Sequence, residues 1–233
     1  MVYCEWRRSR LVRCVLCGGA AEPGCGVCPG CAAELPALGT ACHSCALPLP
    51  PSSGASHRKR QCPACLTRTP ALSSAHCAWH YGFPINQLIQ RFKYDGDLAA
   101  GFSLSALAAK TLADQIDSLD LLVPVPLHWW RYWRRGFNQA ELVAAALGQA
   151  WGLPVGPRVL RKSRPSSAQQ SLDRRQRLRN LSGSFTVRAN VEGCRVGLVD
   201  DVITTGATME SAATALLAAG AMRVSAIALA RTP

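Results

Sequence analysis

The stretch Val196-Gly-Leu-Val-Asp-Asp-Val-Ile-Thr-Thr-Gly-Ala-Thr208 decides the fold class of this 233-residue chain. Its first four residues are almost wholly apolar and predict a buried strand, and residues 207–219 predict a helix that Gly220 closes. A buried strand that passes into a helix is the repeating unit of a parallel sheet. Ligands of such sheets bind beyond the carboxyl ends of the strands, which is where this stretch carries its polar residues.

The rest of the chain after about Ser74 continues the same alternation. Apolar residues at helical spacing, such as Leu88, Ile89 and Phe92, indicate amphipathic helices. We expect strands over residues 75–81, 121–125 and 224–230, and helices over residues 85–94, 98–116 and 138–151 with Gly152 as a C-terminal cap. This order predicts an α/β fold, a parallel sheet flanked by helices on both faces.

The polar residues of the deciding stretch suit a phosphorylated sugar. Asp200 and Asp201 are expected to emerge side by side from the core, where two carboxylates can accept hydrogen bonds from a vicinal diol. Small and hydroxyl-bearing residues follow at a helix start, where backbone N–H groups and the helix dipole favour a phosphate. They are Thr204, Thr205, Gly206, Ala207 and Thr208. No Gly-Lys-Ser/Thr follows, so the stretch is not a Walker loop.

Basic residues gather in two further places. Arg131, Arg134 and Arg135 follow the strand expected at 121–125. One guanidinium group can donate two parallel hydrogen bonds to pyrophosphate oxygens. Aromatic residues interleave with them and suit either packing or stacking on single-stranded DNA bases. Between residues 158 and 179, eight basic residues face one acid, in a chain whose formal charge is +12. That segment is an anion-binding or nucleic-acid-binding patch, or else a solvated charged helix.

Eleven of the twelve cysteines precede Trp79 and mark a separate N-terminal segment. Eight form C-x-x-C pairs, a spacing that lets one turn direct two sulfurs at one zinc ion. The pairs are Cys14 with Cys17, Cys28 with Cys31, Cys42 with Cys45, and Cys62 with Cys65. Two four-thiolate zinc sites are favoured over disulfides, and metal would supply the folding energy of this apolar-poor segment. The spacing leaves open which pairs share a metal and whether Cys25 takes part.

No apolar run reaches the ~18 residues that span a bilayer, and the basic N-terminus lacks the apolar stretch of a secretory signal. We therefore expect a cytoplasmic protein without membrane insertion.

The deciding stretch resembles the phosphoribosyl pyrophosphate (PRPP) motif of type I phosphoribosyltransferases. The flanking segments narrow the resemblance to the ComF family, bacterial phosphoribosyltransferase-like proteins linked to late competence. The segments are Phe92-Lys93-Tyr94, Pro124 to Gln139 with its Arg-Gly-Phe-Asn-Gln ending, and Gln169 to Asn180. With the cysteine pairs, the resemblance covers nearly the whole chain.

The resemblance implies a zinc-ribbon segment at 1–74 with two structural zinc ions, and a phosphoribosyltransferase-like domain at 75–233. Asp200 and Asp201 would hold the ribose hydroxyls, and residues 204–208 the 5-phosphate. Arg131, Arg135 and Lys93 would lie near the pyrophosphate, accompanied by Mg²⁺. A lid at about 158–182 would cover the site, with Gln169, Arg175 and Arg179 as its contributing residues.

The resemblance further implies that the chain binds PRPP and transfers its phosphoribosyl group to an acceptor. Pyrophosphate would leave ribose C1 through an oxocarbenium-like state. No segment indicates a purine or pyrimidine pocket, and glutamine-dependent amidotransfer finds no support in the sequence. The alternatives are a PRPP-sensing protein without turnover and a single-stranded-DNA-handling factor. The partner would then be single-stranded DNA or a protein of the competence machinery.

Overall fold

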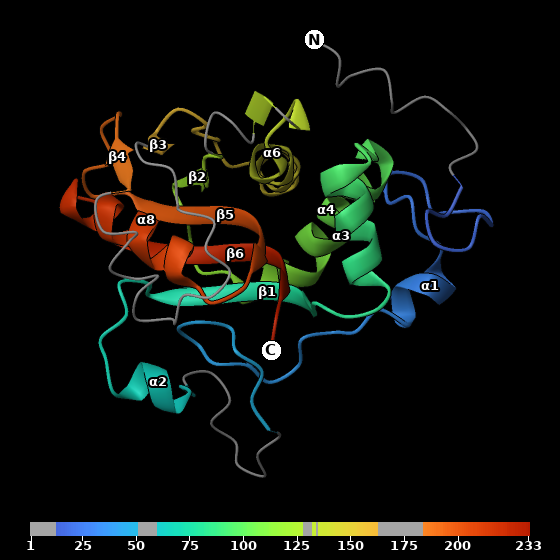
Figure 1. Cartoon of the computed structure of the whole chain (residues 1–233), viewed down its shortest axis with the longest axis horizontal. Coiled ribbons are helices and arrows are strands. Elements are labelled where there is room, and N and C mark those ends of the chain that lie inside the picture. Colours follow the sequence, from blue (N-terminus) through green and yellow to red (C-terminus); the bar gives the residue numbers. More distant parts are fainter. Residues whose placement is uncertain (1–12, 51–59, 128–131, 134, 163–183) are drawn as a thin grey trace.

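A computed structural model of the chain describes residues 13–50, 60–127, 132–133, 135–162 and 184–233. Its main sheet has four parallel strands in the order β1-β6-β5-β2, shown in Figure 1. The strands are β1 (Ser74–His80), β2 (Leu121–Pro124), β5 (Arg195–Ile203) and β6 (Arg223–Arg231). The parallel α/β sheet predicted from the sequence is therefore confirmed.

Helices cover both faces of this sheet. On one face lie α3 (Ile85–Tyr94), α4 (Leu98–Leu112) and α6 (Gln139–Trp151), whose buried residues pack with Val199 of β5 and Leu229 of β6. On the other face, α8 (Ala207–Ala218) packs with Leu198 of β5 and Ala228 of β6. Neighbouring residues of each inner strand thus enter different cores, as the alternation of side chains along a strand requires.

The helix ends follow the sequence signals closely. Asn138 caps α6, because its side-chain oxygen accepts the Ala140 N–H at 3.1 Å. Gly152 ends the helix in the left-handed region at φ +68°, which favours glycine. The helix predicted to reach Ile116 instead ends at Leu112 and continues as a 3₁₀ turn, η2 (Ala113–Gln115). The strand predicted at 196–199 is longer, because β5 extends through both acids to Ile203.

A second, two-stranded antiparallel sheet pairs β3 (Leu160–Lys162) with β4 (Phe185–Val187). This ribbon contains the first residues of the lid expected at 158–182. Gln169, Arg175 and Arg179 lie outside the described residues.

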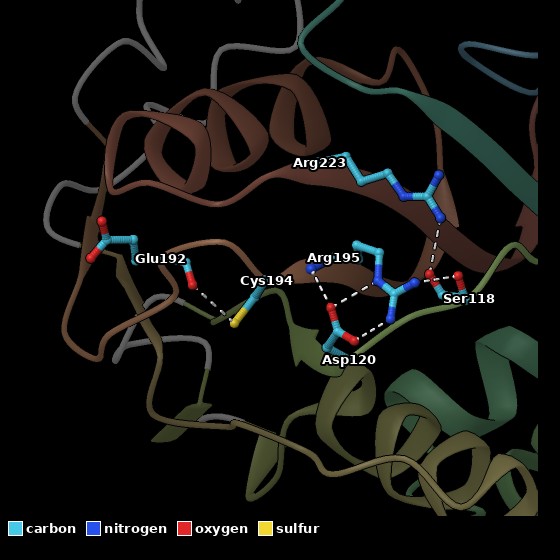
Figure 2. Close-up of polar contacts among 6 residues, drawn as sticks. All are labelled: Ser118, Asp120, Glu192, Cys194, Arg195 and Arg223. Carbon is cyan, nitrogen blue, oxygen red and sulfur yellow. Dashed lines mark hydrogen bonds and ion pairs between the residues drawn. The ribbon is translucent and has the colours of Figure 1, made fainter.

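The amino edge of the main sheet is held by polar contacts, among them an ion pair between Arg195 and Asp120, which Figure 2 shows. Arg195 at the start of β5 donates from Nε to Asp120 Oδ2 at 2.9 Å. Arg223 at the start of β6 donates to the Ser118 carbonyl at 3.0 Å. Because ligands of parallel sheets bind at the opposite edge, this cluster is structural.

The cysteine-rich segment carries two short helices, α1 (Pro29–Ala33) and α2 (Pro63–Leu66), and packs on the α/β core. Residues 36–38 run antiparallel beside β1, where the Leu38 N–H donates to the Ala78 carbonyl at 3.2 Å. Gly26 lies against α4 so closely that an added Cβ would be 2.1 Å from Ser103 Oγ. Among the described residues, no helix has the length and apolar character that crossing a membrane requires.

Candidate functional site

Asp200 and Asp201 lie near the carboxyl end of β5 and differ in their surroundings. Strand alternation directs Asp201 toward α3, where its Oδ1 is 2.9 Å from Lys93 Nζ. Asp201 is only 6% exposed. Asp200 belongs to the opposite face, and its Oδ1 accepts the Asp201 N–H at 2.8 Å. The two acids are therefore adjacent on the strand, but their carboxylates point to opposite faces of the sheet.

Asp200 is the carboxyl group whose proton affinity is most altered at this edge. Burial raises its pKa to about 7, and the nearby carboxylate of Asp201 acts in the same direction. Lys93 and Lys162 oppose the shift without cancelling it. Asp200 can therefore take up or release a proton near neutral pH.

Residues 204–206 connect β5 to α8, and Ala207 and Thr208 are the first two residues of α8, where the sequence predicts a helix start; residues 204–208 together are called the 204–208 turn. Gly206 is the N-cap of α8 and has φ +77°, a conformation that other residues rarely adopt. A glycine cap has no side chain to accept from the first-turn N–H groups, so these groups and the helix dipole face the turn. The Ala207 N–H does find a weak acceptor in Thr205 Oγ1 at 3.4 Å. Backbone N–H groups at a helix start and the helix dipole are features that favour an anion.

Lys93 reaches Asp201 from α3, and Arg135 lies beside the end of the same helix. The Arg135 guanidinium lies 5.2 Å from the centre of the Tyr94 ring and donates to Gln139 Oε1 at 3.3 Å. Through Arg135, the start of α6 therefore lies near Tyr94 at the end of α3, and Tyr94 directly follows Lys93. Arg131, the other predicted pyrophosphate ligand, lies outside the described residues.

Two residues at this edge were not assigned a role from the sequence. Gln139 is 1% exposed, and its Nε2 has no hydrogen-bond partner among the described residues. Arg231 is 3% exposed at the end of β6 and donates to main-chain carbonyls on two sides. The signal for Arg231 was a charged residue that ends an otherwise apolar strand, a placement that requires buried partners.

The eight paired cysteines form two groups in chain order. The first cysteine group is Cys14, Cys17, Cys28 and Cys31, and the second cysteine group is Cys42, Cys45, Cys62 and Cys65. All sulfurs of a group lie within 4.8 Å of one another. The structure thus resolves the pairing that spacing left open, in favour of consecutive pairs.

The geometry of both groups fits a tetrahedral zinc ion. Four sulfurs at Zn–S distances of about 2.3 Å stand roughly 3.8 Å apart. The Cys17–Cys28 and Cys45–Cys62 sulfur pairs are each 3.7 Å apart. Main-chain N–H groups also donate to the thiols, from Cys31 to Cys28 at 3.4 Å and from Cys62 to Cys42 at 3.2 Å. Such donors favour the thiolate form that binds metal.

The electrostatics of Cys14 show this preference. Burial raises the pKa of its thiol, but N–H donors from Cys17, Cys28 and Leu16 outweigh burial and bring the pKa to about 6.

Cys25, Cys77 and His76 belong to neither group. Cys25 is 1% exposed and packs beside the first group, and Cys77 is buried within β1. The His76 Nε2 atom is hydrogen-bonded to Ser74 Oγ at 2.9 Å. Burial lowers the pKa of His76 to about 4. Cys4, which is not part of a C-x-x-C pair, lies outside the described residues.

Comparison with known proteins agrees with this architecture. Residues 133–233 match the phosphoribosyl transferase domain family. The chain is 29% identical over 228 residues to competence protein F of Haemophilus influenzae, covering 94% of this chain and 96% of that protein. It is 32% identical over 212 residues to the DNA utilization protein YhgH of Salmonella typhimurium, covering 89% and 91%. The chain belongs to the ComF family.

Membership of the ComF family accounts for the two parts of the chain, a segment with two four-cysteine groups and a phosphoribosyltransferase-type sheet. Among solved structures, the chain resembles the glutamine PRPP amidotransferase of B. subtilis with a TM-score of 0.38 and 26% identity. That match covers 55% of this chain and 26% of the amidotransferase. The fold assignment rests on the parallel sheet and on the family.

Proposed function

We propose that this ComF protein binds PRPP at the carboxyl ends of β5 and β6 and transfers its phosphoribosyl group to an acceptor. One observation carries the proposal: the acid pair Asp200–Asp201 and the glycine-capped turn at 204–208 are joined within a few residues of one strand end. A diol-binding pair beside an anion-binding turn matches the two polar ends of a 5-phosphorylated ribose.

In this proposal Asp200 and Asp201 orient the sugar. Asp201 accepts from a ribose hydroxyl while Lys93 holds its carboxylate in place from the other side. The N–H groups at the start of α8 bind the 5-phosphate. Fixing both ends of the sugar holds C1 in a defined position for the departure of pyrophosphate, which lowers the entropic part of the barrier.

Cationic side chains would stabilise the negative charge that develops on the leaving pyrophosphate. Arg135 is oriented by Gln139 and by the Tyr94 ring, and the Gln139 amide N–H beside it has no partner in the described part of the chain. One arginine can donate two parallel hydrogen bonds to pyrophosphate oxygens, which suits this role. The expected contributions of Arg131 and of the lid at 158–182 belong to the same proposal.

Mg²⁺ fits this site only together with the substrate. Outside the two cysteine groups, the described residues contain no cluster of three or more ligating side chains. Mg²⁺ commonly binds through one or two carboxylates and substrate phosphates while it keeps several waters. When bound, it would neutralise pyrophosphate charge, with Asp200 or Asp201 as the protein ligand. For the cysteine groups we propose one zinc ion each, as structural metals of a segment that ends near residue 74.

Titration calorimetry of the zinc-loaded chain with PRPP and Mg²⁺ tests the proposal. The parent should bind saturably, and the D200N/D201N chain should lose this binding while its thermal unfolding stays cooperative. D114N, which changes an exposed acid on η2, is the matched control and should bind like the parent. Equal affinity of all three chains would refute the assignment of the acid pair.

A second candidate function is the handling of single-stranded DNA, and exposed aromatic residues favour it. After β2, Tyr132 is 47% exposed and Trp133 is 82% exposed, with Arg135 close in sequence. Aromatic faces beside arginines can stack on successive bases without sequence preference. Oligonucleotide binding that falls steeply with salt and weakens in W133A would support this function. Absence of binding at low salt would exclude it.

A further inference from the structure

Arg231 lies where the cysteine-rich segment meets the proposed PRPP site. It is the last residue of β6, and its side chain is buried beneath the turn that follows β5. Its Nε donates to the Cys45 carbonyl at 2.9 Å. One of its terminal nitrogens donates to the Ile203 carbonyl at 3.3 Å and to the Thr204 carbonyl at 2.5 Å. A single guanidinium therefore bridges the second cysteine group and the first residue of the 204–208 turn.

The charge of Arg231 makes these carbonyls hard to displace. A guanidinium stays protonated in proteins, and a buried charge is costly unless polar groups surround it. Within the described part of the chain, no carboxylate forms an ion pair with Arg231. Main-chain carbonyls therefore stabilise the buried charge of Arg231. If Cys45 shifts, the guanidinium must move with it or lose one of its hydrogen-bond acceptors.

Cys45 is itself fixed by the metal-binding turn. The Ala46 N–H donates to the Cys42 carbonyl at 2.8 Å, and buried Ala46 has φ +56°, a strained value for a residue with a Cβ. A zinc ion held by Cys42 and Cys45 would stabilise this turn and so the position of the Cys45 carbonyl. Without the metal, the strained turn loses its main constraint.

A second contact joins the same two regions. The Ala71 N–H, between the second cysteine group and β1, donates to Glu210 Oε1 at 2.6 Å. Glu210 belongs to the first turn of α8, directly after the proposed phosphate-binding turn. The first cysteine group instead packs near α3 and α4, where Arg91 donates to the Val15 carbonyl at 3.1 Å. The two groups therefore have different neighbours.

We propose that Arg231 is a positioning residue that couples metal occupancy of the second cysteine group to the geometry of the 204–208 turn. PRPP affinity then depends on the second metal site and not on the first. This inference rests on the proposed function. By linkage, bound PRPP must also raise the affinity of the second group for its metal by the same factor.

Cysteine variants of the full chain separate the two metal sites. C62S weakens metal binding in the second group without altering Cys45, and C28S is its counterpart in the first group. Calorimetry with PRPP and Mg²⁺ should show affinity about tenfold lower for C62S, a coupling of ordinary allosteric size, and unchanged for C28S. Zinc content, measured with a colorimetric chelator, should fall from two to one in both chains.

Arginine variants test whether the coupling passes through Arg231. R231K keeps the charge, but one ammonium group cannot span the carbonyls on both sides. It should lower PRPP affinity about tenfold while both zinc ions stay bound, and adding C62S should weaken binding no further. R195K is the matched control, because Arg195 also makes several hydrogen bonds but at the amino edge of the sheet (Figure 2). It should bind PRPP like the parent.

The parent chain provides a test that needs no variant to fold. The equilibrium distribution of zinc between the chain and the chelator is measured with and without saturating PRPP, and PRPP should raise the affinity of the chain for one of the two ions by about tenfold. Unchanged affinity for both zinc ions, or equal PRPP affinity of C62S and C28S, would overturn this inference and leave the proposed function intact. If the parent binds no PRPP, both are wrong.

Discussion

The ion pair between Lys93 and Asp201 gives the sharpest prediction about the proposed site, because its two partners are largely buried. The Lys93 side chain is 19% exposed and the Asp201 side chain 9%, with 2.9 Å between Nζ and Oδ1. K93M leaves the Asp201 carboxylate without its cation in a site that water barely reaches. Removing one partner of a fully buried pair costs about 3–5 kcal/mol.

The partial exposure of Lys93 reduces this cost, so we expect K93M to lower the free energy of unfolding by about 2 kcal/mol. For a chain of this size that corresponds to a melting temperature lower by roughly 4–8 °C. The double variant K93M/D201N removes both charges and should recover most of the loss. The interaction free energy in the double-mutant cycle should therefore be about 1–2 kcal/mol.

Urea unfolding at pH 7.5, followed by tryptophan fluorescence, gives the four free energies of the cycle. K110M is the matched control, because Lys110 lies 3.8 Å from Glu22 in a pair that is more than half exposed. Such surface pairs contribute about 0–1 kcal/mol. A loss of stability in K93M no larger than that in K110M, or an interaction free energy between Lys93 and Asp201 near zero, would refute the reasoning.

Three further predictions concern charge, packing and metal. Because the pKa of Asp200 is raised to about 7, the folded chain keeps a proton that the unfolded chain loses from about pH 4 upward, so stability should fall as pH rises between these values. D200N should lack this part of the pH dependence in its melting temperature, and parallel curves for the two chains would contradict the shift. G197A should lower the free energy of urea unfolding by about 1–3 kcal/mol, because a Cβ would stand 2.6 Å from Leu122 Cδ2; an unchanged midpoint would mean that the core can yield. C14S should bind one zinc ion instead of two and melt at a lower temperature, whereas two ions per chain would show that Cys14 is no ligand.

The sheet could be predicted from the sequence because its signals are local. Apolar runs defined the strands, and Asn138 and Gly152 marked the ends of α6 through the hydrogen bonds and φ values that those residue types favour. The end of β5 could not be found in this way. Asp200 and Asp201 are poor strand residues by composition, but pairing with β6 continues past them to Ile203.

The proposed site was predictable where its residues are adjacent in the sequence and less so where they meet only in three dimensions. The 204–208 turn follows directly from one motif. The pairing of Lys93 with Asp201 required α3 to cross toward the end of β5, which spacing does not encode. The bridge from Arg231 to Cys45 joins residues at opposite ends of the chain, and only the folded structure reveals it.

A crystal structure of the zinc-loaded chain with PRPP and Mg²⁺ tests the central claim most directly. The account predicts the ribose hydroxyls within hydrogen-bonding distance of Asp200 and Asp201, and the 5-phosphate on the N–H groups of the 204–208 turn. PRPP bound elsewhere, or a turn left empty at saturating PRPP, would contradict it.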